Sequence, residues 1–159
     1  MTYSLGQRSL AELHGVHPDL VRVIKRAIAL TTQDFMVVQG TRTKEEMWAN
    51  YGKGRTRAEC GAKGVPVKYA MPGEAKVTWL NDPLMSNHRV MDDGFGHAVD
   101  LGTFPYGGDA KQYRAIWLAM SAAAKAEDVK IRAGIDWDGD GVLMEKGESD
   151  LGHYELVLS

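Results

Sequence analysis

The chain carries one cysteine, Cys60, among its 159 residues. No intramolecular disulfide can form, which excludes the disulfide-stapled scaffolds of small secreted proteins. The length is that of one ordinary domain, and a hydrophobic content of 44% can build a core of its own. We therefore expect a single domain over residues 1–159 that is stabilised by packing, with bound metal as the remaining aid.

The overall charge argues against polyanionic partners. The formal net charge is −2 and the isoelectric point is about 6.2, whereas DNA and anionic lipid call for clustered positive charge. The opening residues lack the basic start and apolar run of a signal peptide, and no later run approaches the roughly 20 apolar residues of a membrane span. We expect a monomer made in the cytoplasm, with no nucleic-acid partner and no stable membrane insertion.

Three segments have helical signals. Residues 17–30 open with a proline at the first turn and carry an apolar stripe at helical spacing. Thr43 and Glu46 predict a capping box for a second helix over residues 43–51. Residues 109–127 begin with an aspartate cap and form the third. The stripes of the first and third helices are Leu20, Val23, Ile24, Ala27 and Ile28, and Tyr113, Ile116, Trp117, Met120 and Ala124.

Short apolar runs between these helices predict strands. Residues 52–87 are rich in Gly, Pro and charge and are interpreted as a long loop around one β segment, residues 76–80. Helices and short strands without a regular βαβ alternation indicate an α+β domain, with a small antiparallel sheet and flanking helices. The other expected strands are residues 35–38, 97–101, 129–133 and 153–158.

Two histidines and one aspartate have the chemistry of a catalytic zinc site. Zinc in such sites takes three protein ligands and leaves a fourth position to water, whose pKa it lowers toward neutrality. Successive side chains of a strand point to opposite faces, so Asp100 and His97 would point apart. His88, brought back across a hairpin, is then the better partner, and His153 would come from a neighbouring strand. Isolated histidines are more often structural, which is our expectation for the remaining ones.

An acidic loop precedes the last strand. Residues 136–141, DWDGDG, reproduce the first half of an EF-hand calcium loop, in which alternating carboxylates bind a hard cation and the glycine allows a sharp turn. The twelfth position is Gly147 instead of glutamate, with Glu145 and Glu148 nearby as substitutes. A solvated acidic turn is the alternative to this predicted calcium site. Its three aspartates are Asp136, Asp138 and Asp140.

Two patterns carry a resemblance to a known family. The combination resembles zinc peptidases that comprise D-alanyl-D-alanine carboxypeptidases and dipeptidases and the L-alanyl-D-glutamate endopeptidases of phage endolysins. Residues 40–56 and 77–79 resemble the endopeptidase branch, and the likeness runs over about residues 10–156. The pattern Ser-x-His-x-x-Gly-x-Ala-x-Asp is matched by Ser86, His88, Gly96, Ala98 and Asp100, and a later acid-x-x-His pattern by Asp150 and His153.

One spacing departs from that pattern. The family leaves two residues between its histidine and glycine, whereas residues 89–95 separate His88 from Gly96 here. A longer loop adds little closure entropy, so we expect His88 to reach the metal despite the insertion.

The resemblance implies a hedgehog/DD-peptidase-like fold and a role for each site residue. Asp150 would be the catalytic base that takes a proton from water and passes it to the leaving amine. Arg42 would stabilise the developing oxyanion, with a surface ion pair as its alternative role. Independently of the resemblance, Glu155 lies two positions after His153, so it would share that strand face and orient a metal ligand, and Ser86 would order its loop by hydrogen bonds. The zinc ligands would be His88, Asp100 and His153.

The function that the resemblance implies is that of a phage endolysin. It would hydrolyse the L-Ala to D-Glu bond of bacterial peptidoglycan stem peptides, accumulate in the host cytoplasm and reach the wall after a separate membrane lesion. Arg42, Arg55 or Arg57 would hold substrate carboxylates. Because the acidic loop leads directly into Asp150 and His153, we also expect calcium bound there to order both residues and activate the enzyme. Two alternatives stay open: a D-Ala-D-Ala carboxypeptidase of the same family, and a zinc-stabilised wall-binding protein without turnover.

Overall fold

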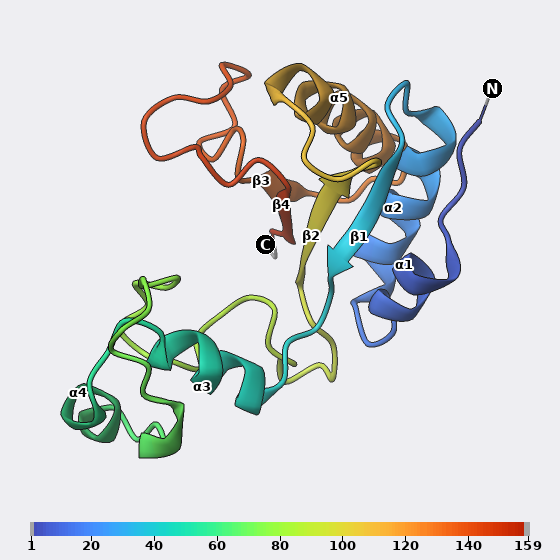
Figure 1. Cartoon of the computed structure of the whole chain (residues 1–159). Coiled ribbons are helices and arrows are strands. Elements are labelled where there is room, and N and C mark those ends of the chain that lie inside the picture. The colour runs from blue at the N-terminus through green and yellow to red at the C-terminus, as the bar shows by residue number, and fades with distance from the viewer. Residues whose placement is uncertain (1, 158–159) are drawn as a thin grey trace.

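Four short strands form an antiparallel sheet at the centre of the molecule (Figure 1). The structure, a computed structural model, describes residues 2–157. The strand order is β1-β2-β4-β3, and each neighbouring pair is antiparallel. The predicted α+β class is confirmed. The strands are β1 (Phe35–Gln39), β2 (Ala98–Thr103), β3 (Ile131–Ala133) and β4 (His153–Leu156).

Two long helices, α2 (Pro18–Leu30) and α5 (Ala110–Ala126), pack on each other and cover one face of the sheet (Figure 1). Both predicted apolar stripes join the main hydrophobic core. The cap of α5 is also as predicted, because Asp109 accepts from the backbone N–H of Gln112 at its first turn. The short helix α1 (Gln7–Glu12), which was not predicted, packs along β1.

Side chains of β2 and β4 alternate between the core and the open face of the sheet. Val99 pairs with Tyr154, and both are fully buried in the core beneath the helices. The next pair in the register is Asp100 with His153. Since alternate strand positions face opposite sides, this second pair points away from the core. The period of the strands thus places two candidate ligands side by side.

A separate helical lobe, residues 43–80, extends beyond the end of β1 (Figure 1). It contains α3 (Lys44–Gly52), α4 (Arg57–Ala62) and the 3₁₀ turn η1 (Val67–Tyr69). Reciprocal capping boxes begin both α-helices, the first at Thr43 and Glu46 as predicted. Tyr51, Cys60 and Val65 form a small core that holds the lobe together.

Several predicted elements differ from the structure. The β segment over residues 76–80 is wrong: no strand forms there, because the Arg55 guanidinium instead of a neighbouring strand bonds the Thr78 carbonyl. The predicted loop also contains α4, whose six residues are too few to show a period. The strand predicted over 129–133 begins only at Ile131, and β4 ends at Leu156. Leu158, the predicted end of that strand, lies outside the described residues.

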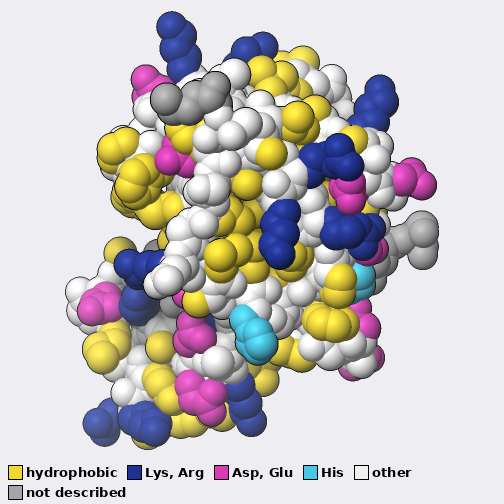
Figure 2. Space-filling view, turned by 90° about the vertical axis from the view of Figure 1, so that its right-hand side faces the viewer, with side chains coloured by type: hydrophobic (Ala, Val, Ile, Leu, Met, Phe, Trp, Pro, Cys, Tyr) yellow, Lys and Arg dark blue, Asp and Glu magenta, His cyan; other side chains and the backbone are white. Residues whose placement is uncertain are grey.

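The surface over α1 and α2 mixes charges. Figure 2 shows Lys and Arg side chains interspersed with Asp and Glu on this face, with apolar side chains between them. It therefore presents no broad patch of one sign. Among the described helices, none has both the length and the apolar character needed to cross a membrane.

Candidate functional site

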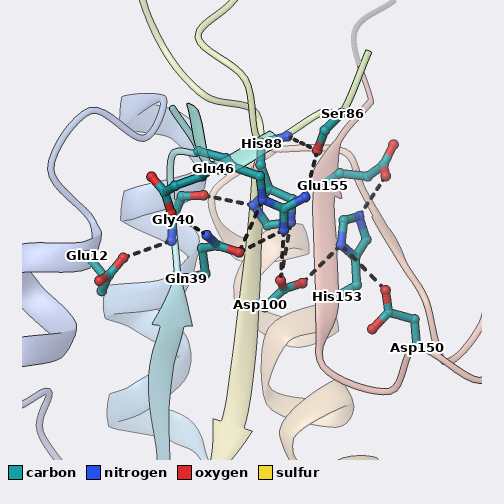
Figure 3. Close-up of polar contacts among 11 residues, drawn as sticks. Glu12, Gln39, Gly40, Glu46, Ser86, His88, Asp100, Asp150, His153 and Glu155 are labelled. Atoms are coloured by element: carbon teal, nitrogen blue, oxygen red, sulfur yellow. Dashed lines mark hydrogen bonds and ion pairs between the residues drawn. The ribbon is translucent and has the colours of Figure 1, made fainter. Parts of the chain in front are cut away.

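Three predicted ligands converge on the open face of the sheet. One ligand atom from each of His88, Asp100 and His153 lies within 4.8 Å of the others. His88 Nε2 is 3.3 Å from Asp100 Oδ2, and His153 Nδ1 is 3.1 Å from Asp100 Oδ1 (Figure 3). Ligands bound about 2.0–2.2 Å from a tetrahedral zinc lie roughly 3.3–3.6 Å apart. The donor types suit zinc, and these two separations lie at or just below that range.

The backbone fixes the ring of His88. Its Nδ1 lies 2.8 Å from the Gly40 carbonyl, which can only accept, so Nδ1 carries a proton and Nε2 is the nitrogen that faces Asp100. Gly40 must lack a side chain for a separate reason, because a Cβ there would lie 1.9 Å from the Glu12 carbonyl oxygen. His88 itself is only 3% exposed. Its metal-facing nitrogen is therefore set by the fold before any ion binds.

A buried carboxylate fixes the ring of His153. Its Nε2 donates to Glu155 Oε1 at 2.8 Å, two residues along the same strand, so Nδ1 faces Asp100. Glu155 also accepts from Arg132 and Asn87 through its second oxygen. This is the outer contact that usually orients a metal-binding histidine. The predicted orienting role of Glu155 agrees with these contacts.

Asp100 and His153 shift each other's pKa. Burial alone would lower the pKa of His153, but hydrogen bonds to Asp100 and Glu155 and the charge of Asp100 raise it to about 9. Burial would raise the pKa of Asp100, yet hydrogen bonds from His153 and His88 and their charges hold it well below its usual range. The site thus concentrates negative charge. The imidazolium balances that charge, and a bound cation can take over this role.

Asp150 lies at the mouth of the cleft. Its Oδ2 is 3.9 Å from His153 Nδ1, and its side chain is 73% exposed (Figure 3). Partial desolvation raises the pKa of Asp150, against the opposing charge of His153, and the Asp100 carboxylate adds to the rise. A carboxylate beside the candidate ligands, reachable by water and with a raised pKa, has the properties of a general base.

The Arg42 side chain lines the cleft close to the cluster of candidate metal ligands. Gln39 Oε1 accepts from its Nε and Nη2 at 3.3 and 2.7 Å, and Ser86 Oγ accepts from its Nη1 at 3.3 Å. Its Nη2 is 3.9 Å from Asp100 Oδ2. Ser86 Oγ also accepts from the backbone N–H of His88, so the serine orders this segment, as expected. Arg42 is a fixed positive charge beside the cluster.

The inserted residues 89–95 close on themselves. Val90 pairs with Gly96 in an isolated antiparallel bridge, and Met91 N–H donates to the Phe95 carbonyl. His88 is therefore returned beside the start of β2, as expected. His97 lies outside the cleft, where its Nε2 is 2.6 Å from Asp93 Oδ2. His17 accepts from the backbone N–H of Asp19 at the start of α2.

The cleft has a volume of about 410 Å³ and lies between the helical lobe and the open face of the sheet. The lobe contributes Asn50, Lys53, Val77 and Thr78, and the other wall includes Gln39 and the metal cluster. Sequence reasoning missed Gln39 and Lys53. A signal for Lys53 was available, because it is flanked by two glycines in the segment that resembles the endopeptidases.

Two arginines considered as substrate ligands lie elsewhere. Arg55 is only 7% exposed and donates to the carbonyls of Tyr51 and Thr78, so it links two segments of the lobe by hydrogen bonds. Arg57 begins α4 and does not line the cleft. Of the three arginines named from the sequence, Arg42 alone lines this cavity.

The acidic loop gathers five carboxylates. Oxygens of Asp136, Asp138 and Glu148 lie within 4.8 Å of one another, as do those of a second set, Asp138, Asp140 and Glu145. The loop contacts the candidate site through Trp137, whose ring centroid is 6.1 Å from that of His153.

Comparisons with known proteins find similar peptidases. A family model described as "Phage L-alanyl-D-glutamate peptidase" matches residues 1–70. The L-alanyl-D-glutamate peptidase of Escherichia phage T5 is 29% identical over 164 residues, which cover 99% of this chain and 100% of that protein. The crystal structure of the Serratia marcescens L-Ala D-Glu endopeptidase ChiX matches with a TM-score of 0.58 and 25% identity, over 95% of this chain and 87% of that one.

The two long matches cover nearly the whole chain, whereas the family model ends before His88. Fold, site geometry and sequence similarity therefore point the same way: this chain is similar to L-alanyl-D-glutamate peptidases over nearly its whole length.

Proposed function

We propose that this protein is a zinc-dependent peptidase that hydrolyses the amide between L-Ala and D-Glu in the stem peptide of bacterial peptidoglycan. The relatives named above carry this activity in their names. Because the substrate belongs to the cell wall, we place its action there, after the host membrane has been permeabilised.

One observation carries the proposal. Two histidines and an aspartate converge, and the ring nitrogen of each histidine that faces away from the cluster is already hydrogen-bonded. An accessible carboxylate lies beside them. His88, Asp100 and His153 would hold the zinc. When bound, zinc supplies a Lewis acid that polarises a carbonyl and makes water more acidic. The open side of the cluster faces the cleft that Asp150 also lines. That arrangement leaves room for water and substrate at the same point.

The chain's own residues divide the remaining work. Asp150 accepts a proton from the attacking water and delivers it to the leaving amine of D-Glu, since it is exposed and has a raised pKa. Arg42, held by Gln39 and Ser86, places positive charge where the oxyanion develops. Glu155 keeps His153 in one orientation.

Mass spectrometry of digested peptidoglycan tests this function. We expect new fragments that begin with D-Glu, together with glycan chains that end in L-Ala. Release of free D-Ala would instead support the carboxypeptidase of the same family. Wall binding without any cleavage, in a sample that contains one zinc per chain, would support a non-catalytic binding protein and contradict the proposal.

We also propose that the acidic loop binds calcium. Asp136 is 6% exposed, and one of its carboxylate oxygens is buried without a hydrogen-bond partner, which is costly unless a cation or another donor satisfies it. The Asp140 charge raises the pKa of Glu145, a repulsion that a cation would relieve. Gly141 has φ +83°, as the sharp turn of a calcium loop requires. A site that offers several ligands, all of them oxygen atoms, suits calcium.

Calcium is therefore expected to stabilise the protein. At about 100 times the Kd, the gain is about 2.7 kcal/mol, which raises the Tm by roughly 5–10 °C. Replacing Asp138 and Asp140 with alanine should abolish the rise, whereas Asp92→Ala, an exposed acid outside the loop, should keep it. Calorimetry with and without calcium, in zinc-saturated protein, provides the measurement. The same Tm in both conditions would contradict calcium binding.

Activation is a separate consequence of the same proposal. Arg132 stacks on Trp137 at 4.3 Å and bonds Glu155, so the loop contacts the residues that orient His153. Ordering the loop should thus raise kcat in the wild type and leave the doubly substituted protein unaffected. Stabilisation without any change in kcat would limit calcium to a structural role.

A further inference from the structure

The cleft wall opposite the metal cluster carries a positive charge that the proposed mechanism does not use. Lys53 lines the cleft together with Asn50, Val77 and Thr78. Among the described residues, no ion pair or hydrogen bond involves its ammonium group, in contrast to Arg42, three of whose N–H groups donate to Gln39 and Ser86. An unpaired cation inside a substrate cleft is a candidate ligand for an anion.

Tight backbone packing sets the position of Lys53. It follows α3 directly and forms an isolated bridge with Met71. The N–H of Gly54 donates to the Met71 carbonyl, and the N–H of Met71 donates to the Gly52 carbonyl. A Cβ on Gly52 would lie 1.8 Å from the Tyr69 carbonyl oxygen, so the chain could not approach so closely with another residue. Lys53 thus extends from a rigid platform.

Buried Arg55 holds the neighbouring part of the wall. It joins the carbonyl of Tyr51, in α3, to that of Thr78, in the extended segment that lines the cleft. The two pieces of wall on either side of Lys53 are therefore fixed to each other. A charged group on a supported wall can select a substrate at less entropic cost than one on a free loop.

The proposed substrate supplies an anion at the required place. A D-glutamyl residue has two carboxyl groups, and only one of them can continue the peptide chain. When the γ-carboxyl does so, the free α-carboxylate is attached to the same carbon as the scissile nitrogen. That carboxylate must enter a cleft already lined by Asp100 and Asp150. A cation on the opposite wall, in addition to the zinc and Arg42 beside Asp100, would offset their repulsion.

We propose that Lys53 binds the free α-carboxylate of the D-glutamyl residue and so makes the enzyme prefer the acid over its amide. The inference rests on the proposed function and adds a specificity determinant to it. Lys53 acts on the leaving-amine side of the substrate and takes no part in proton transfer.

Two synthetic peptides test the assignment, one with D-Glu and one with its α-carboxamide, D-isoglutamine, at the same position. A hydrogen bond to a charged group contributes enough for a preference of about 10- to 100-fold in kcat/KM. We expect the wild type to prefer the acid by that factor. In Lys53→Met the two values should converge, while Lys53→Arg should keep most of the preference because it keeps the charge.

A matched control separates local from general effects of charge. Lys68 is exposed on the same lobe but does not line the cleft, so Lys68→Met should retain the wild-type ratio. Tm and zinc content report whether each variant is folded, and Lys53→Gln replaces Lys53→Met if the latter is not.

The outcomes distinguish this inference from the function beneath it. An unchanged ratio in Lys53→Met, or an equal loss on both peptides, would overturn the role of Lys53. Equal cleavage of both peptides by the wild type would do the same while leaving the peptidase intact. Failure to cut either peptide between L-Ala and D-Glu would overturn the proposed function itself, and this inference with it.

Discussion

Replacing Asp150 with asparagine is expected to lower kcat by about 10²- to 10⁴-fold, the usual contribution of a positioned general base. Asparagine has nearly the same shape but cannot accept the proton of the attacking water. The side chain is 73% exposed and makes no contact closer than 3.9 Å to the histidine beside it, so folding should not depend on it. Steady-state hydrolysis of a synthetic stem peptide measures the loss.

The control for this substitution is Asp92→Asn, which changes an exposed acid away from the cleft. It should leave kcat unchanged. Both variants should bind one zinc per chain and melt near the wild-type temperature. Full activity in Asp150→Asn would show that another group, or solvent itself, accepts the proton.

Removing one candidate ligand has the second large effect. His88→Ala should weaken zinc binding by more than the 10- to 100-fold that is typical when only an outer-shell partner of a ligand is lost, and hydrolysis should fall with it. A metal site that loses one of its three protein ligands cannot keep its geometry. Competition with a chromophoric chelator gives the zinc Kd, and elemental analysis gives the stoichiometry.

The chain offers a matched control for that experiment. His97 is as buried as His88, at 6% against 3% exposed, but it contacts Asp93 and does not line the cleft. His97→Ala therefore creates a similar void and should retain zinc. Equal loss of zinc in both variants would mean that destabilisation, not ligation, explains the result.

Regular periodicity explains why much of the fold was predictable. The stripes of α2 and α5 repeat over several turns. Asp109 and Thr43, together with their capping partners, indicate where helices begin. The pattern around His88, Asp100 and His153 likewise named the residues that the structure brings together. These are local signals, each complete within a short stretch of chain.

Features that depend on distant partners were not predictable. Residues 76–80 have the composition of a strand, but a strand needs a neighbour, and here Arg55 takes its carbonyl instead. The same contact occupies the Arg55 guanidinium, so Arg55 does not serve as a substrate ligand. The pairing of Asp100 with His153 depends on strand register, which no short stretch encodes.

Second contacts of the site show the same limit. The Gly40 carbonyl that fixes His88 lies 48 residues away in sequence. Glu155 was an exception, because its distance of two residues from His153 along one strand predicted a shared face. Lys53 was not predicted, because only the assembled cleft shows which cation lines it.

The most direct test of the whole account is a crystal structure of the zinc-loaded protein with anomalous data at the zinc absorption edge. We expect one strong peak about 2.0–2.2 Å from His88 Nε2, an Asp100 oxygen and His153 Nδ1, with its open side toward Asp150. A peak at another place, or an empty cleft in protein that hydrolyses peptidoglycan, would contradict the proposed metal centre.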